Sequence, residues 1–318
     1  MNTLYRSLNI TKQSFHQRMN RLNQIRSEKQ QLLLFIYQIR QDHPTMGARD
    51  MYYKLLPNCM GRDAFESFCK EEGLMSVKVK NWRRTTDSTG VVRFDNFLAN
   101  MTLTTINQAW QSDITYFEIN QTFYYITFIL DSFSRRILGY CVSKRLTTEQ
   151  TTLPALQMAI NQRNKENMMT KGIVFHSDGG GQYYDKAFLE LTGKEKMVNS
   201  MCEYAWENGK AERINGVIKN NYLIHKNITS FEHLKKEVDR TVLLYNKEKP
   251  HIELRRKSPM EFEKYYLYYR QQSNGDKSTM ELKTQSPENF SALRPEDNNP
   301  SGSNITLEKK TKKVLRRE

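Results

Sequence analysis

Two stretches, GIVFHSDGGGQYY at residues 172–184 and WENGKAERINGVIKNNY at residues 206–222, decide how this chain folds. The first begins with a short apolar run that ends at Asp178, the pattern of a buried strand that delivers a carboxylate at its end. The glycines that follow are expected to free the backbone and to let a bulky group come close. The second is predicted to be a helix with a polar face at steps of four, three and four. That face consists of Asn208, Glu212, Asn215 and Lys219.

A third carboxylate, Asp113, lies in the alternating stretch AWQSDITYFEI at residues 109–119, which predicts a strand. Asp113, Asp178 and Glu212, here called the acidic triad, are separated by 64 and then 33 intervening residues, so only the fold can bring them together. Two Mg²⁺ ions about 3.5–4 Å apart need a bridging carboxylate and an outer ligand each, all hard oxygen donors. Asp113 suits the role of the carboxylate that bridges the two ions. One ion would activate a water or a 3′-hydroxyl, and the other would stabilise the oxygen that leaves phosphorus.

Each of these residues also has a simpler interpretation. A single Asp is more often a turn or cap residue than a metal ligand, and Lys219 alone could be a solvated helix lysine. Asp131 is a rival acid, but it follows an apolar strand at a turn, where Asp is common for turn reasons alone. His176 could polarise the site, although a satisfied strand histidine is the simpler expectation. Only the three carboxylates together favour catalysis.

The charge of the chain indicates a polyanionic partner. Lys and Arg number 49 against 35 Asp and Glu, a net charge of +14, and the excess lies outside residues 101–220. Basic flanks gain by displacing phosphate counterions, although solubility alone is an alternative reason for such a charge. The four cysteines form no CxxC pair, and no apolar run reaches about 18 residues. A cytoplasmic location with reduced thiols is therefore expected.

The region 1–75 is predicted to be a helical DNA-binding region. A short helix, a break near Asn9 and a second helix capped around Thr11 are typical of a helix-turn-helix, and an ordinary helical hairpin is the alternative. Lys12 and Arg18 on the second helix are candidate DNA contacts. Further helices are expected over 29–42, 47–56 and 62–72, with Gly73 as a C-cap. The segment 76–107 resembles a basic linker whose Arg83 and Arg84 contact phosphate, or a solvated tether.

The catalytic core is predicted at 108–225, with strand, strand, strand, helix, strand, helix, strand, helix in that order. Its strands are expected at 110–119, 121–130, 135–143, 172–178 and 196–204, and its helices at 147–164, 184–191 and 207–222. A three-strand meander followed by crossovers gives a mixed α/β sheet of five strands flanked by helices. Residues 226–270 form a C-terminal helical extension, and 271–318 a polar, disordered tail.

Several separate motifs in the right order resemble the DDE transposases of bacterial insertion sequences, in the IS-three-type second-frame branch. The catalytic motifs are Trp110 to Tyr116, His176 to Tyr183, and Asn208 through Glu212 to Lys219. The trailing motif contains Tyr245, Asn246, Pro250, His251, Leu254 and Pro259. The N-terminal part consists of Pro44 to Gly47 and Gly61 to Leu74. The resemblance covers about residues 1–265. Glu207 and Lys249 depart from the family's usual Asp and Arg, and the zinc-binding unit of retroviral integrases is absent.

The resemblance implies an RNase H-like, integrase-type core that uses two Mg²⁺ ions, which Mn²⁺ can replace. It implies that the triad is catalytic and binds the metals, and that Lys219, with Asn208 and Asn215 on the same face, contacts DNA. The reaction would be cleavage and strand transfer of the element's double-stranded ends into target DNA. The expected partners are further copies of the chain and a small helix-turn-helix protein from an upstream frame. In the bacterial cytoplasm, the chain would associate with the nucleoid when bound to DNA.

Two alternatives to an active transposase stay open at this point. One is a catalytically silent DNA-binding regulator derived from a transposase, which would bind element ends without cutting them. The other is a plain metal-dependent nuclease, which would hydrolyse DNA without strand transfer. Product analysis on labelled DNA ends separates all three functions.

Overall fold

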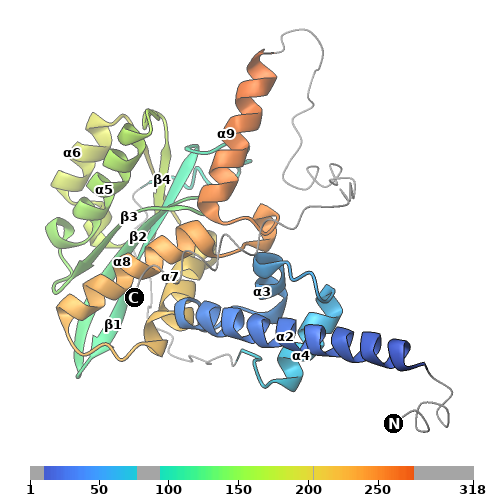
Figure 1. Ribbon diagram of the computed structural model, residues 1–318. Coiled ribbons are helices and arrows are strands. Elements are labelled where there is room, and N and C mark those ends of the chain that lie inside the picture. The colour runs from blue at the N-terminus through green and yellow to red at the C-terminus, as the bar shows by residue number, and fades with distance from the viewer. Residues whose placement is uncertain (1–10, 77–93, 203, 276–318) are drawn as a thin grey trace. The chain divides into compact units, whose positions relative to one another are not determined.

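The computed structural model describes residues 11–76, 94–202 and 204–275. All the described residues belong to one compact unit within Met1–Thr279 (Figure 1). The first helix of the predicted helix-turn-helix, Arg83 and Arg84 lie outside the described residues. The predicted domain boundaries therefore stay predictions.

Three helices, α2 (Lys12–Asp42), α3 (Ala48–Leu55) and α4 (Arg62–Glu71), form the N-terminal region. Thr11 caps α2 as predicted, because its Oγ1 accepts a hydrogen bond of 3.1 Å from Ser14 N. The prediction of two separate helices up to residue 42 is wrong. No proline or glycine interrupts α2, so nothing ends the helix before Asp42.

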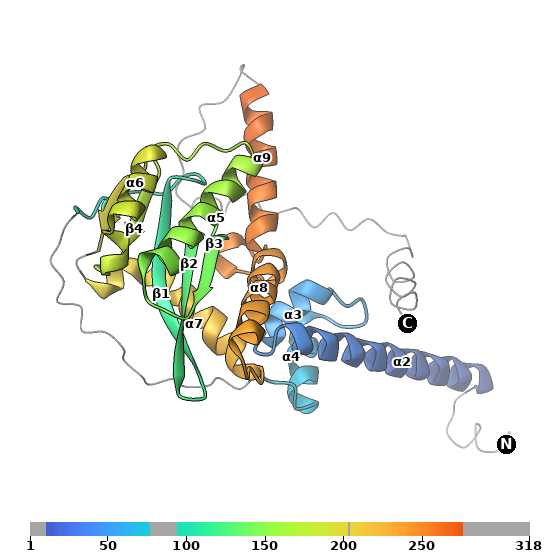
Figure 2. The same ribbon diagram turned by 90° about the vertical axis from the view of Figure 1, so that its left-hand side faces the viewer.

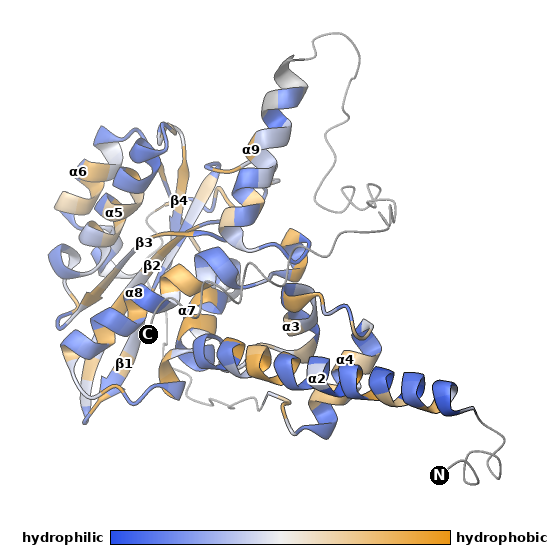
Figure 3. Ribbon diagram, viewed as in Figure 1, coloured by the Kyte–Doolittle hydropathy of each residue, from blue (hydrophilic) through white to orange (hydrophobic). Residues whose placement is uncertain are grey.

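The N-terminal helices bury a small core of their own. Ile36 on α2, Met51 on α3 and Phe65 on α4 are fully buried in it. Gly73 has a φ of +68°, so the predicted C-cap glycine takes the left-handed conformation that ends the α4 region. By contrast, all the described residues from 11 to 24 are exposed, and Figure 3 shows the mainly polar character of that end of α2.

The five predicted strands form one mixed sheet in the order β3-β2-β1-β4-β5. Neighbours β1, β2 and β3 are antiparallel, whereas β4 is parallel to β1 and β5 is parallel to β4. The strands span β1 Ala109–Ile119, β2 Thr122–Asp131, β3 Ile137–Ser143, β4 Val174–Ser177 and β5 Val198–Met201. The strand that carries Asp113 is thus the central one, and the predicted mixed sheet of five strands flanked by helices is confirmed.

Helices cover both faces of the sheet (Figures 1 and 2). On one face lie α5 (Thr152–Lys165) and α6 (Lys186–Lys194), packed on Trp110, Phe175 and other apolar side chains. On the other lie α7 (Gly209–Asn221) and α8 (Phe231–Glu248). The alternation of β1 explains this division, since its even-numbered Trp110 and its odd-numbered Phe117 and Ile119 point to opposite faces.

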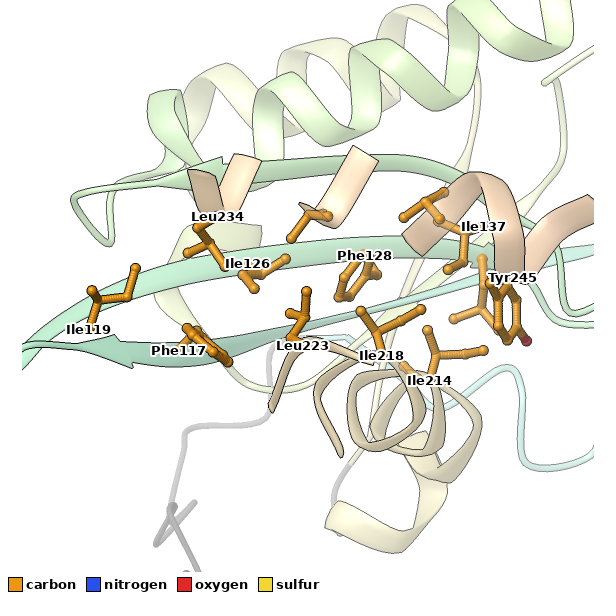
Figure 4. Packing of buried hydrophobic residues seen from close by; sticks show 14 residues of the cluster. Phe117, Ile119, Ile126, Phe128, Ile137, Ile214, Ile218, Leu223, Leu234 and Tyr245 are labelled. Atoms are coloured by element: carbon orange, nitrogen blue, oxygen red, sulfur yellow. The ribbon is translucent and has the colours of Figure 1, made fainter. Parts of the chain in front are cut away.

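The core under α7 and α8 holds the helix that carries Glu212. Ile214 and Ile218 of α7 pack with Phe128 of β2 and Tyr245 of α8, as Figure 4 shows. Full burial of an Ile or Phe side chain contributes about 1.5–3 kcal/mol. The apolar side of α7 therefore fixes its polar side, with Glu212, relative to the sheet.

Helix α5 lies against β3 at Gly139. A Cβ atom at this position would come within 2.1 Å of the Ala155 carbonyl oxygen, so only glycine allows the helix backbone to approach so closely. On the opposite face, Asn246 of α8 binds the edge of the sheet, because its Nδ2 donates to Ile137 O (2.8 Å) and its Oδ1 accepts from Ile137 N (2.9 Å). Asn246, part of the trailing motif, thus fastens α8 to β3.

Helix α9 spans Pro259–Gly275, so the predicted disordered tail begins too early. Residues 271–275 continue the helix because no proline follows Pro259 within it, while 276–318 lie outside the described residues. The described part of the predicted linker, residues 94–107, contains no helix or strand, but it is not a free tether. Phe97 N donates to Ser200 Oγ at 3.0 Å, which ties this segment to β5.

A buried network of charges, here called the ionic cluster, joins α9 to the sheet. Arg163 of α5 is fully buried, and its guanidinium bonds Glu263 of α9 at 2.7 Å and approaches Asp131 at 3.3 Å. Arg136 bonds Glu263 at 2.5 Å and Glu166 at 2.6 Å. The sequence did not indicate this network, since its members come from four separate elements. Among the described residues, no helix is long and apolar enough to span a membrane.

Candidate active site

Strand pairing brings the first two carboxylates of the acidic triad together. Ser112 of β1 pairs with Ser177 of β4 in parallel register, so Asp113 and Asp178 occupy the next positions along two neighbouring chains. In neighbouring parallel strands, the residues that follow a register pair lie next to each other in the same direction along both strands. The strand register therefore brings Asp113 and Asp178 near each other, although 64 residues separate them in the sequence.

The third carboxylate is placed by two asparagines that fasten α7 to β1. Asn208 Nδ2 donates to Ser112 O at 2.9 Å, and Asn215 Nδ2 donates to Asp113 Oδ2 at 2.8 Å. Glu212 lies between them in sequence and on the same helix face, in the first turn of α7. Glu212 is itself exposed, so the asparagines fix its backbone while its side chain can change rotamer.

Burial raises the pKa of all three triad carboxyls, and neighbouring carboxylates raise the pKa of Asp113 and Glu212 further. Burial first, and then the charges of Asp178 and Glu212, raise the pKa of Asp113 to about 7. Burial also raises the pKa of Asp178, and burial with the charge of Asp178 raises that of Glu212. Mutual repulsion of this kind is what a bound cation relieves, and clustered shifts of pKa are typical of functional sites.

The donor set suits a hard divalent cation, because all three side chains offer carboxylate oxygens. However, within the described ranges no three His, Cys, Asp or Glu side chains are grouped closely enough to hold one metal ion. Two of the carboxylates are held by protein donors instead. Asp113 accepts from Ile114 N (2.8 Å) and from Asn215, and Asp178 Oδ1 accepts from Gly180 N (3.2 Å). The triad residues are electrostatic neighbours whose side chains must reorient to share an ion.

The glycines after Asp178 do not act as predicted. None of Gly179, Gly180 and Gly181 takes a positive φ, so an unusual backbone conformation is not their role. The close approach lies at Gly179, where a Cβ would meet Met201 Cε at 2.7 Å, while at Gly181 there is open space. Asp178 itself shapes the turn, because its Oδ1 accepts from the amide of Gly180.

Asn208 and Asn215 were expected to contact DNA, and the structure corrects this. Their exposed fractions are only 2% and 6%, and both side chains are bonded inside the protein. Lys219, two turns beyond Glu212, is half-buried, with Nζ 4.5 Å from the centre of the Tyr116 ring. Lys12 and Arg18 are exposed on α2. Contact between DNA and these three cations stays a proposal.

Three residues that the sequence analysis overlooked support the start of α7. Gln111 Nε2 donates to Asn208 Oδ1 at 3.3 Å, and Ser132 Oγ donates to Gln111 Oε1 at 3.0 Å. Lys210 Nζ donates to Ser132 O at 3.1 Å, and burial lowers its pKa to about 8. Gln111 had a signal in the sequence, because a polar residue two positions before Asp113 shares its face of the strand.

The two rival residues have structural roles. Asp131 is fully buried, and its Oδ1 accepts from Phe133 N and Ser134 N, both at 2.9 Å, as expected for a turn aspartate. His176 is also fully buried, with Nδ1 3.0 Å from Ser200 Oγ, and burial lowers its pKa to about 4. Neither is part of the acidic triad.

Comparison with known proteins places an integrase core domain in the same part of the chain. Two family descriptions, both named integrase core domain, match residues 104–205 and 195–259. An uncharacterised 31 kDa protein of insertion element IS600 from Shigella sonnei is 29% identical over 230 residues, which cover 70% of this chain and 83% of that protein. A putative transposase of IS986/IS6110 from Mycobacterium tuberculosis is 33% identical over 116 residues, which cover 36% of this chain and 41% of that protein.

Among solved structures, the catalytic core domain of HTLV-2 integrase in complex with magnesium is similar, with a TM-score of 0.40 and 21% identity. That likeness covers 49% of this chain and 96% of the viral domain. The family matches define a protein with an integrase core domain. Transposases of bacterial insertion sequences are among the similar proteins, and these matches support an enzyme of the polynucleotidyl transferase type.

Proposed function

We propose that the chain cleaves the ends of an insertion sequence and joins them to target DNA, with the acidic triad as its divalent-metal ligands. The observation that carries the proposal is that Asp113, Asp178 and Glu212, from three separate segments of the chain, lie within electrostatic reach of one another. Within the described residues, none of the three forms a salt bridge with a Lys or Arg. A site with this excess of negative charge suits Mg²⁺ or Mn²⁺.

In this reaction, Asp113, Asp178 and Glu212 would together hold the two ions. When bound, the ions would activate the attacking water or 3′-hydroxyl and stabilise the departing oxygen during an in-line displacement at phosphorus. Asn215 orients Asp113 by its hydrogen bond of 2.8 Å. Asn208, the N-cap residue of α7, fastens the start of the helix that carries Glu212 to β1.

Double-stranded DNA, as element ends and as target, is the proposed substrate. The chain's net charge of +14 supports this, because each phosphate contact releases counterions. Among the proposed DNA contacts, Lys219 lies closest in sequence to the acidic triad. Lys12 and Arg18 are exposed on α2, and Arg83 and Arg84 are proposed from sequence alone. We also propose that the chain acts as a homo-oligomer. It would work with a small helix-turn-helix protein from an upstream frame, and at the nucleoid when bound to DNA.

The test uses labelled DNA carrying the inverted repeats that flank the gene, with Mg²⁺ or Mn²⁺. Asp113→Asn, Asp178→Asn and Glu212→Gln should each reduce cleavage and joining at least about 1,000-fold, since metal catalysis is worth several kcal/mol of barrier. Glu190→Gln, at an exposed position on α6, is the control and should keep full activity. Binding without cutting by the unmodified chain would support the silent regulator. Hydrolysis without joined products would support the plain nuclease.

A further inference from the structure

Two aromatic rings stand exposed on the segment that leads into α7. The rings of Tyr204 and Trp206 are stacked with their centres 4.5 Å apart and an angle of 6° between their planes. Trp206 is 73% exposed and Tyr204 is 47% exposed. One face of the indole is therefore covered by the tyrosine, and its other face is open to solvent. Large aromatic side chains usually bury most of their area, so this arrangement needs a reason.

The backbone beneath these rings is held at both sides. Tyr204 N donates to Glu207 Oε2 at 3.0 Å, and Glu207 N donates to Tyr204 O at 3.0 Å, which closes a tight turn. Directly after it, Asn208 is 2% exposed and is bonded to β1. The rings are thus exposed on a fixed base, which lowers the entropy lost when a ligand binds.

The rings also lie next to the acidic triad along the chain. Met201 pairs with Ser177, the residue before Asp178, and Tyr204 follows Met201 by three positions. Trp206 precedes Glu212 by six positions. After burial, the charge of Asp178 is the next cause that raises the pKa of Cys202 to about 12, so this segment lies within electrostatic reach of the site.

We propose that Tyr204 and Trp206 form a platform on which an unpaired base of the DNA end stacks beside the acidic triad. This inference rests on the proposed function, because a DNA end must lie at the triad. A base inside a duplex has both faces covered by its neighbours, whereas an unpaired base offers a free π face. The open face of the indole matches one such base in size and flatness.

A protein partner fits these residues less well. A stable protein interface buries about 800 Å² on each side and involves roughly 20–30 residues. The exposed large apolar side chains of the segment 204–210 are these two rings, and the residues that follow, 207–210, are Glu, Asn, Gly and Lys. Stacking of a base on an aromatic side chain needs no larger surface, and it tolerates any base sequence.

The test compares two short DNA probes of arbitrary sequence in the presence of a metal chelator. One is a blunt duplex, and the other is the same duplex with a single-stranded extension that contains a fluorescent purine analogue. The unmodified full chain should quench the analogue. Trp206→Ala should weaken binding of the extended probe about tenfold, within the range of one stacked base, and binding of the blunt duplex less than about twofold. Trp206→Phe should retain most of the affinity.

The matched control is Tyr268→Ala, which removes an exposed aromatic ring on α9 and should change neither affinity. The proposal would be overturned if Trp206→Ala lost equal affinity for both probes or lost none for the extended probe. It would also be overturned if the unmodified chain did not quench the analogue. A lower mass in sedimentation for Trp206→Ala, with DNA binding unchanged, would assign the rings to contact between copies and would also overturn it. Because the chelator prevents metal-dependent cleavage, the result is independent of whether the acidic triad proves catalytic.

Discussion

The acidic triad and the ionic cluster each contain three carboxylates, yet the cations beside them differ. In the cluster, burial raises the pKa of Asp131, whereas the pKa values of Glu166 and Glu263 are lowered. In the ionic cluster, Arg163 and Arg136 lie within hydrogen-bonding distance of Glu263, and their effect outweighs burial and lowers the pKa of that carboxyl. In the acidic triad, no such cation is bonded within the described residues, and all three pKa values are raised. The comparison shows that residue type alone does not separate a structural acid from a functional one. The charged residues that the fold places beside a carboxylate make that distinction.

Glu263 and Asp113 should make pH-dependent contributions to stability of opposite sign. The lowered pKa of Glu263 gives stability that is present above the pKa of an unfolded glutamate and is lost as the pH falls. The raised pKa of Asp113 gives stability that is present at low pH and is lost as the pH rises through about 7. A metal-free chain should therefore be most stable between these two limits.

The largest expected effect is on the ionic cluster. Glu263→Ala leaves Arg163 and Arg136 buried without their shared carboxylate, so the free energy of unfolding should fall by about 3–5 kcal/mol. Urea unfolding followed by circular dichroism measures this. Glu212→Ala, at an exposed carboxylate of the acidic triad, should change stability by less than about 0.5 kcal/mol while abolishing activity. Equal destabilisation by the two variants would remove the distinction between the groups.

A divalent cation should stabilise the chain through the acidic triad alone. At a free Mg²⁺ concentration one hundred times the dissociation constant, the gain in free energy of unfolding is about 2.7 kcal/mol. Thermal melts with Mg²⁺ and with Na⁺ at equal ionic strength measure the specific part. The double variant Asp113→Asn, Asp178→Asn should lose this gain, whereas Glu166→Gln, in the ionic cluster, should keep it. Stabilisation that persists in the double variant would place the cation elsewhere.

Without metal, Asp113→Asn should stabilise the chain at pH about 8. The substitution removes a charge that the site disfavours, and the gain should be on the order of 1–2 kcal/mol, since partial solvation reduces the full effect of the shift. Asn215 Oδ1 has no hydrogen-bond partner, so a flipped Asn215 can accept from the new amide. The gain should vanish near pH 4, where Asp113 of the unmodified chain is already protonated. Unfolding curves at both pH values provide the test, and a gain of equal size at both would contradict it.

The smallest effect concerns Asn215→Ala. Its donor lowers the pKa of Asp113, so removing it should raise that pKa further and shift the rising part of the pH–activity profile upward by less than about one unit. The lost hydrogen bond should cost about 1 kcal/mol of stability. Asn161→Ala, on the exposed side of α5, is the matched control and should leave the profile in place. An unshifted profile for Asn215→Ala would limit Asn215 to a structural role.

Much of the fold could be predicted because local patterns dominate it. The alternation of 109–119 and the apolar run of 121–130 predicted β1 and β2, and the order of strands and helices gave the mixed sheet. Boundaries were less accurate where local signals are weak. Helix α2 continues past residue 26, and α9 continues past residue 270, because neither stretch contains a residue that stops a helix.

The sequence by itself determined the three acids, the helix face that carries Glu212 and the strands that carry the other two, since periodicity and short motifs are local properties. Only the tertiary structure decided which polar residues are available. Asn208 and Asn215 share a face with Glu212, yet the packing of α7 on β1 buries both. Likewise Asp131 and Asp113 each lie on a strand, but Arg163 of α5 reaches Asp131. A residue's burial and its charged partners depend on distant segments of the chain, and for that reason local patterns cannot specify them.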